Sequence, residues 1–289
     1  MTGAKPDDRV VVSLLRSCGQ CFFCTTGSPH LCNGRFAMDS QSRPHNLRGE
    51  ALTQRFKTAA FAEYVIVDQS QVVLIPSHIP LDRAALLACG VITGLGAVVN
   101  TARVRPRQSV VVIGTGGVGL NAIQGAVLVG ADPIIAVDLL NSKLETAQAF
   151  GATHIINPSQ QDLARRVEEI TAGRYADYAF VTVGSSTAAA QALNLVRSGG
   201  MVVLVGIPHE GATVAVPIFD LVRNARRLIG SLMGSTRLQV DVPRLVELYQ
   251  QGRLKLDELI SARYPLEQIN QAIGVMEQGE SVRNMIVFD

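Results

Sequence analysis

The chain has 289 residues, of which 47% are hydrophobic and 17% charged, a composition typical of a globular protein and not of a disordered one. Its net charge of +2 is too small to favour nucleic acid or an anionic membrane surface as a partner. Met1–Arg9 has no apolar core, and the apolar Ser109–Asp138 is interrupted by glycines. We therefore expect neither a signal peptide nor a membrane span, and a cytoplasmic location.

The first third of the chain predicts β structure. Short apolar runs at Val10–Leu15, Ala62–Val67 and Val72–Ile75 are separated by a polar stretch, Gly34–Lys57, that contains proline and arginine. Runs of this length between loop-like segments are typical of strands. We expect a β-rich unit with long loops.

Four of the five cysteines lie close together, at Cys18, Cys21, Cys24 and Cys32. Four thiolates can hold one zinc ion tetrahedrally, and a site with four protein ligands has no open position for a substrate, so we predict structural zinc. The alternatives are buried free cysteines, two disulfides or an iron–sulfur cluster. The close spacing strains disulfide geometry, and iron–sulfur ligands usually follow other spacings.

From about residue 91 the pattern changes to strands that alternate with helices. The expected strands are Val110–Ile113, Ile134–Val137, Ile155–Ile156, Tyr178–Val183 and Met201–Val205, and the expected helices are Val118–Val129, Ser142–Phe150, Asp162–Thr171 and Thr187–Val196. Repeated βα units with apolar strands imply a parallel sheet covered on both faces. We predict an α/β fold with a Rossmann-type doubly wound sheet.

A glycine turn, Gly114-Thr-Gly116-Gly117-Val118-Gly119, follows the first of these strands and opens a helix. In this context Gly114 permits the turn, Gly116 lets the backbone approach a pyrophosphate, and Gly119 allows close packing of helix and strand. The N–H groups of the helix start, around Gly117 and Val118, are suited to bind phosphates. A purely structural turn is the alternative.

Asp138 ends the second strand, about 20 residues beyond the turn, where an acidic residue binds the adenine ribose. It can accept hydrogen bonds from both ribose hydroxyls and would repel a 2′-phosphate, so we expect NAD(H) and not NADP(H). Lys143 could reach the same ribose.

The C-terminal tail contains two amphipathic helices, Val242–Gln251 and Leu266–Glu277, and a strand-like run, Met285–Phe288. We expect it to pack with the N-terminal part as one domain. The predicted domains are residues 1–90, a partial catalytic domain with the zinc loop, 91–232, the NAD-binding domain, and 233–289, the rest of the catalytic domain.

In this order and at this separation, the cysteine loop and the glycine turn resemble the zinc-containing medium-chain alcohol dehydrogenases, over essentially the whole chain. The resemblance implies a GroES-like catalytic domain around the cysteine loop. It also implies a catalytic-zinc ligand at Cys89 and a threonine near the nicotinamide at Thr93, within Cys89-Gly-Val-Ile-Thr93. Further cofactor contacts are implied at Val183, Gly184, Ile207 and Arg283. Family members associate through the coenzyme domain, so a homodimer or homotetramer is expected.

The sequence departs from the family at the catalytic zinc. In the family, a segment before the structural-zinc loop supplies a cysteine and a histidine to this metal. The present sequence begins just before the loop, so we expect only Cys89 to remain of the three usual ligands. The pair His209-Glu210 follows the last expected strand and is not expected to replace them. A small buried hydrophobe is the alternative for Cys89.

The leading hypothesis is an NAD(H)-dependent zinc alcohol dehydrogenase that transfers hydride between a small alcohol or aldehyde and the cofactor, an activity that N-terminal truncation would impair. The alternative is a non-catalytic NAD(H)-binding protein with structural zinc. A zinc-free quinone-reductase-like enzyme is disfavoured because that branch generally lacks the four-cysteine loop and Cys89.

Overall fold

A computed structural model describes residues 3–40, 44–279 and 281–288, and the chain divides into two compact units. The first consists of Met1–Cys89 with Thr236–Asp289, and the second is Gly90–Ser235. No helix of the described residues is long and apolar enough to cross a membrane.

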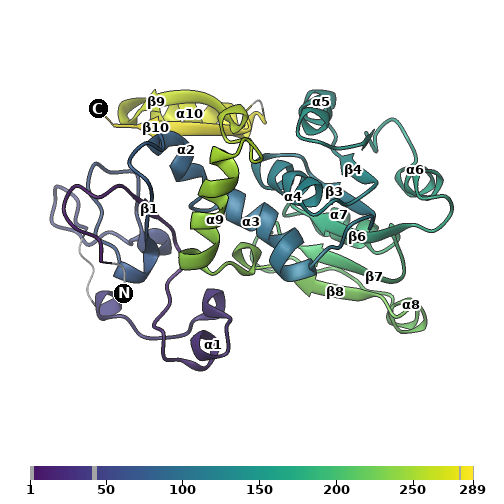
Figure 1. Ribbon diagram of the computed structural model, residues 1–289, viewed down its shortest axis with the longest axis horizontal. Coiled ribbons are helices and arrows are strands. Elements are labelled where there is room, and N and C mark those ends of the chain that lie inside the picture. Colours follow the sequence, from purple (N-terminus) through teal and green to yellow (C-terminus); the bar gives the residue numbers. More distant parts are fainter. Residues whose placement is uncertain (1–2, 41–43, 280, 289) are drawn as a thin grey trace. The chain divides into compact units, whose positions relative to one another are not determined.

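The first unit contains two small sheets (Figure 1). Strands β1 (Val10–Val12) and β2 (Val72–Leu74) pair antiparallel, with Val11 opposite Val73. Strands β9 (Ile260–Pro265) and β10 (Arg283–Val287) pair in parallel. The α-helices are α1 (Phe22–Thr25), α2 (Leu81–Leu86), α9 (Leu238–Gln250) and α10 (Ile269–Glu277). Short 3-10 turns occupy Pro29–Leu31, Ala37–Ser40, Arg55–Lys57, Gln69–Gln71, Asp257–Leu259 and Leu266–Gln268.

The strand expected at Ala62–Val67 is wrong. This segment forms bends and irregular backbone, and Tyr64 and Ile66 are 89% and 56% exposed. Its apolar side chains are exposed at successive positions, so the run has no buried face that a strand would need.

The second unit is built on a six-stranded parallel sheet in the order β5-β4-β3-β6-β7-β8. Its strands are β3 (Val110–Ile113), β4 (Ile134–Val137), β5 (His154–Ile156), β6 (Ala176–Val181), β7 (Val196–Leu204) and β8 (Arg227–Gly230). Every residue of β3 and β4 is buried, as their uniformly apolar sequences require. The predicted parallel Rossmann-type sheet is confirmed.

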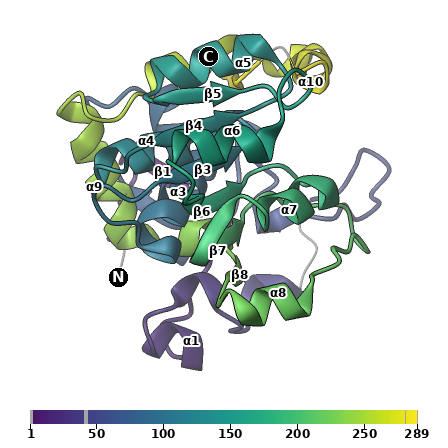
Figure 2. The same ribbon diagram turned by 90° about the vertical axis from the view of Figure 1, so that its right-hand side faces the viewer.

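Helices cover both faces of this sheet, with α4 and α6 on opposite sides of its central strands (Figure 2). The helices of this unit are α3 (Gly90–Gly96), the π-helical segment Ala97–Ala102, α4 (Gly117–Leu128), α5 (Asn141–Ala149), α6 (Leu163–Ile170), α7 (Ser186–Ala192), α8 (Ile218–Arg223) and a 3-10 turn at Met233–Ser235. Asp162 and Ser185 begin α6 and α7 by accepting backbone N–H groups, as N-cap residues do.

Candidate cofactor and zinc sites

The four clustered cysteines converge on one point. The Sγ atoms of Cys18, Cys21, Cys24 and Cys32 all lie within 4.8 Å of one another, and those of Cys21 and Cys32 are 3.8 Å apart. Zinc–sulfur bonds of about 2.3 Å in a tetrahedron place the sulfurs about 3.8 Å apart, so the residues fit a zinc ion. A disulfide would need a far shorter separation, and all five cysteines are free thiols.

Backbone N–H groups donate hydrogen bonds to the sulfur atoms of this cluster, which favours the thiolate form that binds a cation. The N–H groups of Cys18 and Gly34 donate to Cys32 Sγ at 3.3 and 3.4 Å. A hydrogen bond from the backbone of Cys24 is the main cause that lowers the pKa of Cys21 to about 6, whereas burial raises the pKa of Cys24 to about 12. A zinc ion at the centre would favour the thiolate form at every position.

Gly34 closes the cysteine loop. A Cβ atom at this position would lie 2.7 Å from both Cβ and Sγ of Cys18. Only glycine therefore lets the chain pass the cluster without displacing a ligand.

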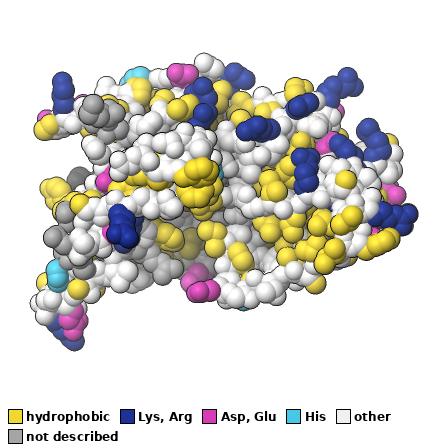
Figure 3. All heavy atoms as spheres, turned by 90° about the horizontal axis from the view of Figure 1, so that it is seen from below, with side chains coloured by type: hydrophobic (Ala, Val, Ile, Leu, Met, Phe, Trp, Pro, Cys, Tyr) yellow, Lys and Arg dark blue, Asp and Glu magenta, His cyan; other side chains and the backbone are white. Residues whose placement is uncertain are grey.

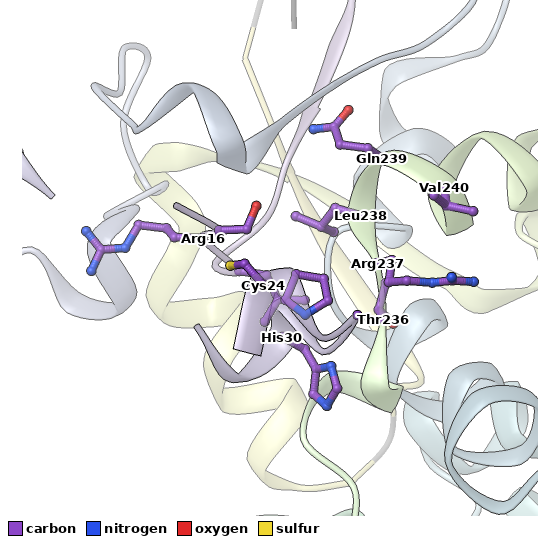
Figure 4. Close-up of a pocket in the computed structure, with 12 residues that line it drawn as sticks. Arg16, Cys24, His30, Thr236, Arg237, Leu238, Gln239 and Val240 are labelled. Atoms are coloured by element: carbon purple, nitrogen blue, oxygen red, sulfur yellow. The ribbon is translucent and has the colours of Figure 1, made fainter. Parts of the chain in front are cut away.

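A cavity of about 260 Å³ lies between the cysteine loop and the start of α9 (Figure 4). Cys24 and His30 line it, but the charged ends of Arg16 and Arg237 point away from it. Arg16 instead pairs with Asp39, Nη1 to Oδ1 at 2.8 Å. His30 is half-buried, and burial lowers its pKa. Charged groups do not converge on this cavity.

The glycine turn of the second unit joins β3 to α4. Gly114 has a φ of +90°, and a Cβ there would overlap Val183. A Cβ at Gly119 would overlap the carbonyl oxygen of Gly114. Gly116, in contrast, faces open space. Packing thus requires glycine at 114 and 119, while Gly116 leaves room beside the first turn of α4. The N–H groups of that turn have no acceptor within the helix.

Asp138 follows β4 and is bonded to the glycine turn. Its Oδ2 accepts hydrogen bonds from the backbone N–H and the hydroxyl of Thr115, at 2.8 and 3.0 Å. Its Oδ1 accepts the N–H of Leu140 at 3.1 Å. Lys143, in the first turn of α5, is half-exposed. Thr115 could not be identified from the sequence alone, because its hydrogen bonds to Asp138 form only where the ends of β3 and β4 lie side by side.

A cavity of about 530 Å³ opens at the carboxyl ends of β3 and β4. It is lined by Gly114, Asp138, Leu139, Ser159, Val183 and Gln191, among others. The turn at Gly184 lies against Ile207, since a Cβ on Gly184 would be 2.5 Å from the Ile207 carbonyl oxygen. The edge where parallel strands end is where dinucleotides bind in such sheets, and these residues fit one.

The residues that the resemblance assigned beyond the glycine turn lie in both units. Thr93 is buried in α3, and its hydroxyl donates to Met233 Sδ at 3.5 Å. Cys89 is exposed, so the alternative of a buried hydrophobe is wrong. Arg283, in β10, is half-buried; burial lowers its pKa, and the charge of Cys89 acts against that shift.

Among the described residues, the four-cysteine cluster is the one group of three or more His, Cys, Asp or Glu side chains able to hold a metal. His209 is exposed and its Nδ1 lies 3.0 Å from the carbonyl oxygen of Glu210. Cys89 belongs to no group of three or more such side chains among the described residues, so a catalytic-zinc site with three protein ligands does not fit them.

Comparisons with known proteins agree with this geometry. Residues 1–77 match the family model described as the alcohol dehydrogenase GroES-like domain, and residues 117–251 match the zinc-binding dehydrogenase model. The chain is 36% identical to a putative alcohol dehydrogenase D of Mycobacterium tuberculosis, over 99% of this chain and 80% of that protein. It is also 36% identical to S-(hydroxymethyl)glutathione dehydrogenase of Saccharomyces cerevisiae, over 99% of this chain and 77% of the relative.

Among solved structures, benzyl alcohol dehydrogenase from Acinetobacter calcoaceticus is similar, with a TM-score of 0.90 and 32% identity over 99% of this chain and 80% of that one. The agreement extends over both units of the chain.

Proposed function

Since the chain belongs to the zinc-containing alcohol dehydrogenase family, an oxidoreductase family, we propose that it interconverts a small alcohol and its aldehyde with NAD(H) as the redox partner. The cofactor, when bound, accepts or donates the hydride. The proposal is carried by one observation: Asp138 is hydrogen-bonded to the glycine turn, and both line a cavity of about 530 Å³.

We assign the cofactor contacts as follows. The open space at Gly116 admits the pyrophosphate, which the N–H groups of Gly117, Val118 and Gly119 bind at the positive end of α4. Asp138 binds the adenine ribose and repels a 2′-phosphate, which favours NAD(H).

At the other half of the cofactor, the turns at Val183–Gly184 and at Ile207 support the nicotinamide side of the cavity, as the family resemblance implies. Thr93 and Arg283 are proposed to contact the nicotinamide and the pyrophosphate, and Lys143 the ribose. These roles follow from matching motifs.

We propose that Cys18, Cys21, Cys24 and Cys32 bind a structural zinc, since four thiol ligands leave no place for a substrate. By resemblance Cys89 corresponds to a ligand of the family's catalytic zinc, but it belongs to no group of three possible metal ligands among the described residues, so we propose no role for that metal in this chain. Thiols that must stay reduced favour the cytoplasm.

We propose that the chain forms a homodimer or homotetramer, with the surface of the second unit as the interface. Strand β8 ends the sheet and has one neighbouring strand among the described residues. Next to it in sequence, α8 exposes Ile218, Phe219 and Val222 by 74%, 71% and 73%. Hydrophobic side chains also gather on the face in Figure 3, toward the end of the second unit that carries α8. An exposed strand edge and an apolar helix both favour association.

The test is the rate of NADH formation by the purified, zinc-replete protein with NAD⁺ and a panel of primary alcohols. The panel includes benzyl alcohol and S-(hydroxymethyl)glutathione, the compounds in the names of two similar proteins. We expect NADH formation from NAD⁺ with at least one alcohol of the panel. NADH binding without turnover on any alcohol would contradict the proposal and favour the non-catalytic NAD(H)-binding alternative.

A further inference from the structure

Thr115 stands between two glycines of the cofactor-binding turn and is 1% exposed. Both of its polar donors go to one atom, because its N–H and its hydroxyl donate to Asp138 Oδ2 at 2.8 and 3.0 Å. A buried hydroxyl needs a partner, but most threonines in turns bond to nearby backbone. Here the hydroxyl bonds to the carboxylate that we assign to cofactor selection.

The remaining acceptor capacity of Asp138 can be counted. A carboxylate has about four lone-pair sites, two on each oxygen. Thr115 occupies both sites of Oδ2, and the Leu140 N–H occupies one site of Oδ1 at 3.1 Å. One acceptor site on Oδ1 is left for a ribose hydroxyl. The sequence suggested that Asp138 could serve both hydroxyls, and the geometry reduces this to one strong bond.

Fixing the carboxylate also lowers the cost of binding. An aspartate that is held by three donors before the ligand arrives loses little rotamer freedom when the ribose binds. The bonds from Thr115 also connect the glycine turn, which we propose binds the pyrophosphate, to Asp138, which we propose binds the ribose. The two halves of the adenosine diphosphate site are therefore oriented together.

We propose that Thr115 is a positioning residue for cofactor selection: it turns Oδ1 of Asp138 toward the adenine ribose, so that the site takes a nicotinamide dinucleotide with a free 2′-hydroxyl through one charge-assisted hydrogen bond. The inference rests on the proposed NAD(H) dependence and adds a second residue to its specificity. Thr115 touches the carboxylate and acts on the cofactor through it.

The test compares NADH with its analogue that has 2′-deoxyadenosine, each titrated by fluorescence into the wild-type protein, Thr115→Val and Thr115→Ser. The valine variant keeps the shape of the side chain and removes the hydroxyl donor, whereas serine keeps the donor. We expect Thr115→Val to weaken NADH binding about fivefold, since a hydrogen bond to a charged group is removed. The deoxy analogue should change by less than about twofold, and Thr115→Ser should retain the wild-type discrimination.

Two results would overturn the inference. An equal loss for both ligands in Thr115→Val would give Thr115 a structural role only, and no loss for either ligand would show that Asp138 needs no positioning. If Thr115→Val does not fold, as judged by its thermal midpoint without cofactor, Thr115→Ala removes the same donor and decides the same question. Failure of the wild-type protein to bind NADH would instead refute the proposed cofactor, so the two failures are distinguishable.

Discussion

At the scale of single residues, Asp177 in β6 connects the start of β3 with β7 through side-chain hydrogen bonds. Its Oδ2 accepts the N–H and the hydroxyl of Ser109, each at 2.8 Å, and its Oδ1 accepts Arg197 Nε at 2.8 Å. Burial acts to raise the pKa of Asp177, but the bonds from Ser109 and Arg197 outweigh it and hold the pKa below its ordinary value of 3.8. The ionised form is therefore the one that stabilises the fold.

This predicts a pH dependence of stability. A carboxyl whose pKa is lower in the folded state contributes stability above its unfolded pKa, and loses it as the pH falls through the folded pKa. We expect Asp177→Asn to lower the free energy of unfolding near neutral pH by about 1–2 kcal/mol. In urea unfolding, the gap from wild type should close below about pH 4. A gap that stays constant well below about pH 4 would contradict the assignment.

At the scale of elements, the glycines of the turn between β3 and α4 have different roles, in folding and in ligand binding. A Cβ on Gly119 would overlap the Gly114 carbonyl, which is part of the fold itself. A Cβ on Gly116 would enter open space, so it would obstruct a bound ligand and not the fold. Stability and cofactor affinity should therefore separate between these two positions.

We expect Gly119→Ala to lower the free energy of unfolding of the second unit by more than about 2 kcal/mol, as forced overlap with backbone does. Gly116→Ala, the matched control, should change it by less than about 0.5 kcal/mol but weaken NADH binding at least about tenfold. Denaturant unfolding and NADH titration measure the two effects. If Gly116→Ala binds NADH like the wild type, the pyrophosphate does not approach there.

Strands that are apolar throughout were predictable from the sequence, and the edge strand β8, which begins with a charged residue, was not. The strands at Val110–Ile113 and Ile134–Val137 have the expected bounds because buried parallel strands are apolar throughout. Strand β8 was missed because an edge strand that begins with Arg227 lacks that signal. The cysteine cluster was predictable from local spacing, whereas the bond between Thr115 and Asp138 joins residues that only the folded sheet brings together.

At the scale of the whole molecule, the chain forms two units, and the first is assembled from both ends of the sequence. The cysteine cluster belongs to the first unit, while the glycine turn and Asp138 belong to the second. Each unit has its own buried residues, so damage to one need not unfold the other.

Cys21→Ser tests this independence. Removing one of four ligands should release zinc and loosen the loop from Ser17 to Gly34, because metal binding and loop folding are coupled. NADH affinity should stay within about twofold of wild type. Zinc content, hydrogen exchange of the loop and NADH titration are the measurements. Loss of NADH affinity while the parallel sheet keeps its exchange protection would show that the units are energetically coupled.

The central claim is that the second unit is an NAD(H) site, and equilibrium titration of the purified protein with NADH and with NADPH tests it most directly. We predict saturable binding of NADH that is at least about tenfold tighter than binding of NADPH, because a carboxylate at the proposed position of Asp138 would accept a hydrogen bond from a 2′-hydroxyl and repel a 2′-phosphate. No binding of NADH, or tighter binding of NADPH, would contradict the account.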